Sequence, residues 1–84
     1  MSQFWLMKNL SQKCILVSIF AQNVKSYRLQ QGLSQEQLAE RAGVHRTYIG
    51  MLEREEKNVT IYNIERIAIA LGLEAYQLLK SKND

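Results

Sequence analysis

The chain contains no proline, only four glycines and a single cysteine, Cys14. So few obligatory chain breaks favour helices joined by tight turns over a fold built from many short strands. A lone cysteine excludes an internal disulfide and a cysteine-rich metal cluster, and this usage is typical of a reducing compartment. Because Cys14 opens the apolar run of residues 14–17, we expect it to be a small buried hydrophobe.

Long hydrophobic runs are also missing. The mostly apolar run of residues 14–21 falls well short of the about 20 residues that a membrane-spanning helix needs. Lys8 and Lys13 precede this run as the basic residues of a secretory signal would, but its apolar pattern continues in helical register into Val24 and Leu29. We therefore expect the run to belong to the folded domain, and the chain to be cytoplasmic and not bound to a membrane.

The charge balance is only mildly one-sided. Lys and Arg number 11 against 8 Asp and Glu, and the net charge of +3 suits a polyanionic partner without identifying it. With 84 residues, of which 46% are apolar, the chain is long enough for one domain with one modest core. One histidine, one cysteine and no convergent carboxylate cluster offer no catalytic site, so we expect no enzyme, no cofactor and no metal.

The remaining residues are arranged as helices with recognisable ends. Ser34 followed by Gln37 forms a capping box, and Thr60 is a second helix cap. Three of the four glycines follow stretches of helical periodicity, as helix-ending glycines do: Gly32, Gly43 and Gly72. The spacing predicts helices over residues 13–31, 34–42, 45–54 and 60–71, with a short fifth helix after residue 72.

Apolar side chains at three- and four-residue spacing should face a common core. In the first helix they are Leu16, Phe20, Val24 and Tyr27; in the fourth, Ile61, Ile64, Ile67, Ala68 and Leu71; in the fifth, Leu73, Tyr76, Leu78 and Leu79. The prediction is an all-α, compact five-helix domain over residues 13–80, with an amino-terminal extension (1–12) and a polar tail (81–84).

Residues 35–53 carry the most informative pattern. Ala39 is small enough to let two helices cross closely through a short turn, and Gly43 permits a left-handed backbone in that turn. Val44 can plug the turn into the core, while Ile49 and Leu52 can hold the second helix against the first. Each residue is weak evidence alone, but the combination at this spacing predicts a helix-turn-helix.

The second helix of this motif separates into two arcs. Ile49, Leu52 and Glu53 lie on one arc, and the other, expected to face outward, holds Arg46, Thr47, Gly50, Met51 and Arg54. The outward arc is where such a helix presents side chains to the major groove of DNA. Arg46 is the best candidate for base reading, because a guanidinium can pair with guanine through two hydrogen bonds. Gly50 either gives DNA room to approach or is tolerated without a function.

From Phe20 to Leu79 the sequence resembles the lambda-repressor-like, Cro-type (XRE) helix-turn-helix superfamily of transcriptional regulators. The residues that carry the resemblance are 32–39, 42–44, 49–54 and 64–72. Residues 45–50, 52–54 and 57–60 are particularly similar to the controller proteins of restriction-modification systems, which are small dimeric regulators that time endonuclease expression. Residues 1–12 have no counterpart in the family pattern.

The resemblance implies a set of functional residues. The base-facing positions are matched by Arg46, Thr47 and Met51, and the positions contacting the DNA backbone by Gln35, His45, Tyr48, Lys57 and Asn58. Tyr48 is divided between packing and a phosphate hydrogen bond, and His45 could meet a phosphate or a base edge. Arg28 and Glu53 occupy positions where the superfamily often has an ion pair.

The expected partners are double-stranded DNA and a second copy of the chain. A dimer interface is expected at Leu73, Tyr76 and Leu79, whose apolar surface exceeds what so small a core can bury, with the segment around Trp5 as an addition. Glu55 and Glu56 are interpreted as solvated surface, or as a surface facing RNA polymerase.

Two other functions fit the same fold. One is a prophage repressor or the antitoxin half of a toxin–antitoxin pair. The other is a helix-turn-helix scaffold used for protein–protein contact through residues 4–7, against which the outward Arg46 and the basic charge excess both count.

Overall fold

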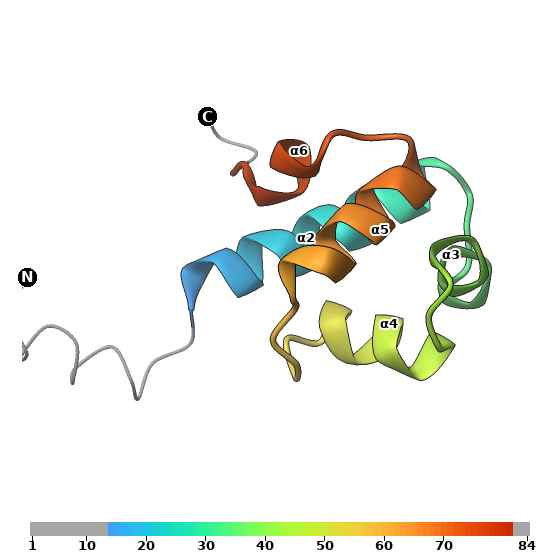
Figure 1. Cartoon of the computed structure of the whole chain (residues 1–84), viewed down its shortest axis with the longest axis horizontal. Helices are drawn as coiled ribbons and strands as arrows, with labels where there is room; N and C mark the ends of the chain where they lie inside the picture. Colours follow the sequence, from blue (N-terminus) through green and yellow to red (C-terminus); the bar gives the residue numbers. More distant parts are fainter. Residues whose placement is uncertain (1–13, 82–84) are drawn as a thin grey trace, which may run out of the picture.

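The computed structural model describes residues 14–81, and the expected extension 1–12 and residues 82–84 of the tail lie outside that range. The described part contains five α-helices and no strand: α2 (Ile15–Gln30), α3 (Gln35–Ala42), α4 (Arg46–Glu53), α5 (Ile61–Leu71) and α6 (Ala75–Leu79). In Figure 1, α2 and α5 cross the middle of the molecule, α3 and α4 lie to one side of them, and α6 covers the opposite side. The all-helical prediction is confirmed.

The ends of the helices follow the capping residues. The Ser34 hydroxyl accepts a hydrogen bond from the Gln37 amide at 3.0 Å, and the Gln37 side chain accepts one from the Ser34 amide at 2.8 Å. Thr60 caps α5 in the same way by accepting from the amide of Asn63 at 3.1 Å. These side chains satisfy amides that have no partner within the helix, which is why α3 and α5 begin where they do.

The core is built from apolar side chains of all five helices. Its largest fully buried members are Phe20, Val24, Leu38, Ile49, Leu52, Ile67 and Leu78. Most of the predicted stripes are therefore present, but two of their members at the starts of helices are exposed: Leu16 is 49% exposed and Ile61 is 86% exposed. Both lie in the first turn of a helix, where side chains lean toward the amino terminus and project past the helices that cover the following turns.

Two further burial predictions were wrong. Cys14 is exposed, because it is the residue that precedes α2 and lies outside the stretch that α4 to α6 cover. Tyr76, expected both in the apolar stripe of the fifth helix and at a dimer interface, is 65% exposed. A helix as short as α6 can bury only one face, and Leu78, two residues further on, occupies that face.

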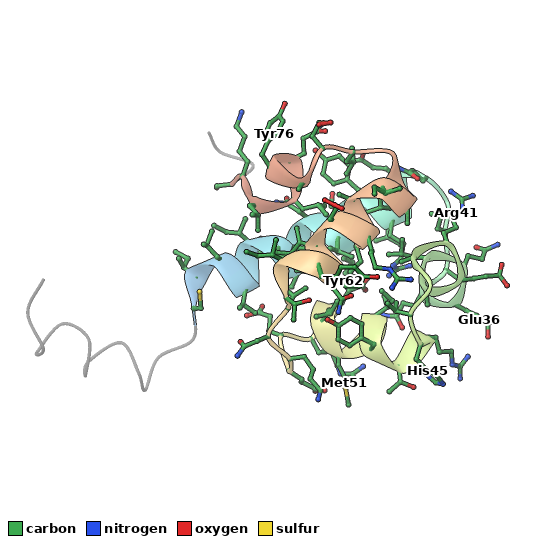
Figure 2. The ribbon with its side chains drawn as sticks, in the orientation of Figure 1. Glu36, Arg41, His45, Met51, Tyr62 and Tyr76 are labelled. Atoms are coloured by element: carbon green, nitrogen blue, oxygen red, sulfur yellow. The ribbon has the colours of Figure 1, made fainter. Side chains whose placement is uncertain are left out.

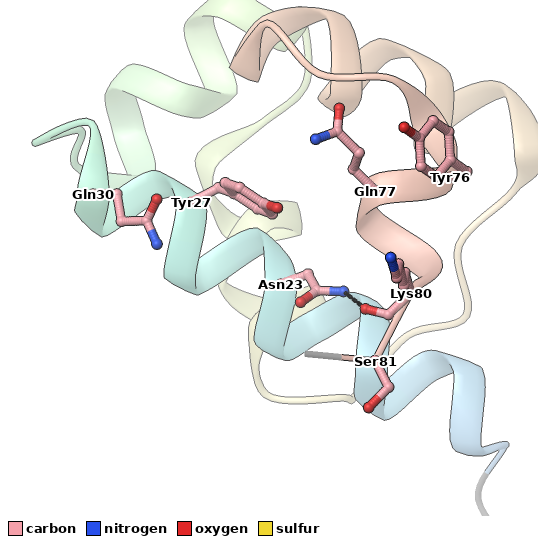
Figure 3. A pocket seen from close by; sticks show the side chains of 7 residues that line it. All are labelled: Asn23, Tyr27, Gln30, Tyr76, Gln77, Lys80 and Ser81. Atoms are coloured by element: carbon pink, nitrogen blue, oxygen red, sulfur yellow. Dashed lines mark hydrogen bonds between the residues drawn. The ribbon is translucent and has the colours of Figure 1, made fainter. Parts of the chain in front are cut away.

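A buried amide anchors α6 to α2. The Asn23 side chain, only 2% exposed, donates hydrogen bonds to the carbonyl oxygens of Leu78 and Lys80, each at 2.9 Å. The second of these bonds is visible in Figure 3, which also shows the shallow hollow that α2 and α6 form around it. Asn23 supplies the acceptors at the end of α6 with donors that the helix itself cannot provide. In the described range, no helix is long and apolar enough to cross a membrane.

Candidate nucleic-acid interface

The turn between α3 and α4 fixes the angle between these helices. Gly43 has a left-handed backbone (φ +70°), and the amides of Gly43 and Val44 return to the carbonyls of Glu40 and Ala39 at 3.2 and 3.0 Å. This arrangement is the usual way to close a helix with a glycine. His45 then caps α4, because its ring Nδ1 accepts a hydrogen bond from the Thr47 amide at 3.2 Å. His45 is therefore a helix cap, a role that its sequence position had not suggested.

The crossing of the two helices leaves an open groove on the surface, which we call the recognition groove. It is lined by Arg28, Ser34, Gln35, Glu36, Arg46, Thr47, Gly50 and Arg54. The groove thus brings Gln35 at the start of α3 next to Arg46 and Thr47 at the start of α4. Because the first amides of a helix have no partner inside it and carry the positive end of the helix dipole, the start of α3 is suited to an anion such as a phosphate.

The outward side chains of α4 lie on one edge of the molecule. Figure 2 shows His45 and Met51 along this edge and Tyr76 on the opposite side. Arg46 and Thr47 are exposed and Met51 is half-buried. The guanidinium of Arg46 lies 3.6 Å from the Glu36 carboxylate, and both side chains are largely exposed, so a competing anion can replace this weak pair.

A buried polar network joins α2, α3 and α4 beneath the groove. Arg28 and Glu53 form a bidentate ion pair, with Nε–Oε2 at 2.7 Å and Nη2–Oε1 at 3.0 Å. Arg28 also donates to the Leu33 carbonyl at 2.8 Å. The side-chain Nε2 of Gln35 donates to Glu53 Oε1 at 3.1 Å. The Arg28–Glu53 pair is the one expected from the sequence. The bond from Gln35 was not anticipated, and it fixes the first residue of α3 against the end of α4.

Gly50 lies beneath the Arg54 side chain in the lining of the recognition groove. It is buried, because the Arg54 side chain folds back over it: a Cβ atom at this position would lie 3.2 Å from Arg54 Nη1 and 3.5 Å from Gln35 Oε1. Glu56 holds the Arg54 guanidinium through hydrogen bonds of 3.0 and 3.1 Å. The side-chain hydrogen bond raises the pKa of Arg54 and lowers that of Glu56. The missing side chain at Gly50 thus makes room for a cation in the groove.

The surface continues from Tyr48 in α4 into the loop that follows this helix. Tyr48 is half-buried against the core, and its hydroxyl accepts a hydrogen bond from the Asn63 side chain at 2.9 Å, which leaves the hydroxyl proton to be donated elsewhere. Lys57 and Asn58 are exposed in the loop. Glu55, expected to be solvated, is half-buried, has a left-handed backbone (φ 63°) and accepts from the Ser18 hydroxyl at 3.4 Å.

Sequence reasoning missed three side chains of this region: Arg54, Asn63 and Arg66. Arg54 was placed on the outward arc but was not selected as a site residue. Asn63 and Arg66 lie on α5, outside the motif, and their role depends on how α5 packs against it. The spacing of Tyr62 and Arg66, one helical turn apart, was the only signal available for the latter.

Known proteins are similar to this chain in sequence and in fold. The helix-turn-helix family profile matches residues 24–78. The chain is 54% identical to the control protein C.SmaI of Serratia marcescens over 61 residues, which make up 73% of each chain. It is 45% identical over 64 residues to a hypothetical transcription factor of Neisseria meningitidis, where the match covers 76% of this chain and 60% of the relative.

Solved structures agree with these matches. The Neisseria hypothetical transcription factor NHTF superposes with a TM-score of 0.79 at 43% identity, covering 81% of this chain and 78% of that one. The restriction-modification controller protein C.AhdI of Aeromonas hydrophila gives a TM-score of 0.72 at 40% identity, with 74% and 94% coverage. The chain therefore belongs to the helix-turn-helix family of DNA-binding transcriptional regulators, and restriction-modification controller proteins are among its relatives.

Proposed function

We propose that the chain is a homodimeric controller protein of a restriction-modification system, which binds a palindromic operator in double-stranded DNA and regulates transcription from it. The recognition groove carries this proposal, because it gathers two exposed arginines, Arg46 and Arg54, and the starts of two helices on one open surface. The 54% identity to a control protein supports the choice of this branch over a prophage repressor or an antitoxin.

Base reading is assigned to the exposed side of α4. Arg46 and Thr47 lie in its first turn, which is the part of a recognition helix that contacts base edges. A guanidinium that leaves the exposed Glu36 carboxylate exchanges a weak ion pair for two hydrogen bonds to guanine O6 and N7. Met51, one turn further along, can contribute an apolar contact such as that with a thymine methyl group.

Phosphate contacts are assigned to the groups that surround this helix. The start of α3 at Gln35 offers free amides, and the Tyr48 hydroxyl has a proton to donate. His45 uses Nδ1 as the acceptor of the helix cap, so its other ring nitrogen, Nε2, can donate a hydrogen bond to a phosphate. Lys57 and Asn58, exposed in the loop after α4, complete the set.

The dimer is assigned to the side of the molecule that carries α6. Tyr76 lies opposite the α4 edge in Figure 2, so a partner bound there leaves α4 accessible. Leu73 and Leu79 are half-buried against the protein's own core, and Tyr76 would therefore carry most of the interface. Two copies related by a two-fold axis would present their α4 helices to half-sites about 34 Å apart.

We place the regulator in the cytoplasm, where its operator lies, and keep RNA polymerase as a second partner in the case of activation. Glu56 is exposed, and such a contact would have to replace its pair with Arg54, whereas Glu55 is half-buried and bonded to Ser18.

Selection of duplexes from a random-sequence DNA pool by the full chain tests the proposal. We expect enrichment of a symmetric site, and footprinting of the DNA upstream of the chain's own gene should protect a related sequence. A pool that stays random after several rounds would contradict sequence-specific binding, and an enriched site without symmetry would contradict the dimer. A protected site beside an integrase gene or a toxin gene would replace the controller assignment by one of its alternatives.

A further inference from the structure

One cation of α5 reaches across to the turn between α3 and α4. Arg66 donates from Nε to the Ala42 carbonyl at 2.9 Å and from Nη2 to the Gly43 carbonyl at 3.2 Å. The two acceptors are consecutive, and the planar guanidinium fork bonds both of them at once. No other part of α5 makes hydrogen bonds to this turn among the bonds described for residues 14–81.

These carbonyls are acceptors that α3 cannot satisfy by itself. The glycine closure of α3 uses the carbonyls of Ala39 and Glu40, and the carbonyls that follow are left at the negative end of the helix dipole. A guanidinium bonded to them is favoured by its charge as well as by its geometry. Arg66 therefore caps α3 from a different helix.

Two neighbours keep the guanidinium in place. Tyr62, one turn earlier on α5, accepts a hydrogen bond from Nη1 at 3.1 Å, and the Arg66 guanidinium lies over its ring at 5.2 Å from the centroid. Gly43 leaves the necessary space, because a Cβ atom there would overlap Nη2 of Arg66. A glycine at position 43 thus suits the left-handed backbone and leaves the guanidinium of Arg66 in place.

The position of this contact matters for DNA binding. Residues 43–45 determine where α4 begins, and Arg46 follows directly. The far end of α4 is held separately by the pair of Glu53 with Arg28. We propose that Arg66 is a positioning residue for the recognition helix: by holding the carbonyls of Ala42 and Gly43 against α5, it sets the place of the first turn of α4. The inference rests on the proposed function in that α4 reads DNA.

The binding test compares Arg66→Met with Arg41→Met. Both variants lose one positive charge beside the end of α3, but Arg41 is exposed on the last turn of α3 and its loss leaves the bonds from Arg66 intact. The probes are a duplex selected by the wild-type chain from a random pool and a scrambled duplex of equal length and composition. A displaced α4 loses contacts to the bases. Arg66→Met should therefore weaken binding to the selected duplex by about ten-fold or more, and binding to the scrambled duplex much less. Arg41→Met should affect both duplexes equally.

Arg66→Lys is the second variant, and it remains informative if Arg66→Met does not fold. A lysine retains the charge but can bond the two carbonyls less well, so its discrimination between the two duplexes should fall between those of the wild type and Arg66→Met. The proposal would be overturned if Arg66→Met lost equal affinity for both duplexes. It would also be overturned if Arg66→Met preferred the selected duplex as strongly as the wild type does.

Amide hydrogen exchange tests, without DNA, whether Arg66 holds the turn between α3 and α4. In Arg66→Met we expect faster exchange at the amides of Gly43 and Val44 and at the first turn of α4, with the centre of α2 unchanged. Faster exchange spread evenly over all helices would show a general stabilising role and overturn the positioning role. If no duplex is ever selected, the DNA proposal fails by itself, while the exchange measurement still decides whether Arg66 holds the turn.

Discussion

The buried pair of Arg28 and Glu53 permits a quantitative prediction. Their side chains are 9% and 4% exposed, and the Glu53 carboxylate receives three hydrogen bonds, two from Arg28 and one from Gln35. Glu53→Gln retains the shape but turns an NH2 group toward the N–H donors of Arg28. The guanidinium then loses its charge partner in a buried site, which should destabilise the fold by about 3–5 kcal/mol.

This loss is large for a domain of this size, whose total stability is about 5–15 kcal/mol. It corresponds to a fall in melting temperature of more than about 12 °C, since each kcal/mol shifts a small domain by about 4–8 °C. Arg28→Met should cost a similar amount, because it leaves the carboxylate buried and unpaired. It also frees the Leu33 carbonyl, but the same cost occurs in the double variant and cancels in the comparison.

The assay is a double-mutant cycle in urea and thermal unfolding, followed by circular dichroism. The double variant, which buries neither charge, should be more stable than the sum of the single losses implies, by at least about 2 kcal/mol. Gln35→Ala removes only the hydrogen bond from Gln35 to Glu53. It should lower the free energy of unfolding by about 1–2 kcal/mol, against which the other losses can be compared. If the single losses add to within about 0.5 kcal/mol in the double variant, the reasoning from the buried pair is refuted.

Substitutions at three other positions test separate parts of the molecule. Arg46→Ala should cost about 1–3 kcal/mol on the selected duplex and relax the preference at one base, and equal losses on selected and scrambled DNA would exclude base reading. Glu55→Gly should exceed Glu55→Ala in stability by about 1 kcal/mol, because only glycine relieves the left-handed backbone at φ 63° once the carboxylate is gone; equal unfolding midpoints would show no strain there. Glu56→Gln should tighten binding to any duplex by releasing Arg54 in the recognition groove, and unchanged binding to scrambled DNA would mean that Arg54 does not meet phosphate.

The helices could be predicted because their signals are local. The capping box of Ser34 and Gln37 and the glycine after α3 mark ends that depend only on residues within one turn. Burial was less predictable at the ends of helices. Ile61 and Tyr76 have the right spacing for the core, but spacing assumes a covering helix at every turn, and neither residue has one.

In the candidate site, too, local features could be predicted from the sequence, whereas contacts between helices could not. The outward arc of α4 and the Arg28–Glu53 pair could be assigned from spacing and from the family resemblance. The contacts of Arg66, Asn23 and Gln35 join residues 24, 57 and 18 positions apart, so they arise only from the angles between helices. Gly50 shows the same limit. Helical spacing places Arg54 on the outward arc, but its side chain folds back over Gly50.

We propose above that two copies of the chain read one operator through α4. Sedimentation velocity of the chain with the selected duplex, at micromolar protein and two salt concentrations, tests it most directly. We expect a complex of two chains per duplex that forms on half-sites about one helical turn apart and dissociates steeply as salt rises. A complex with a single chain per duplex would contradict the dimer, and sedimentation of protein and duplex as separate species at low salt would contradict the DNA-binding role itself.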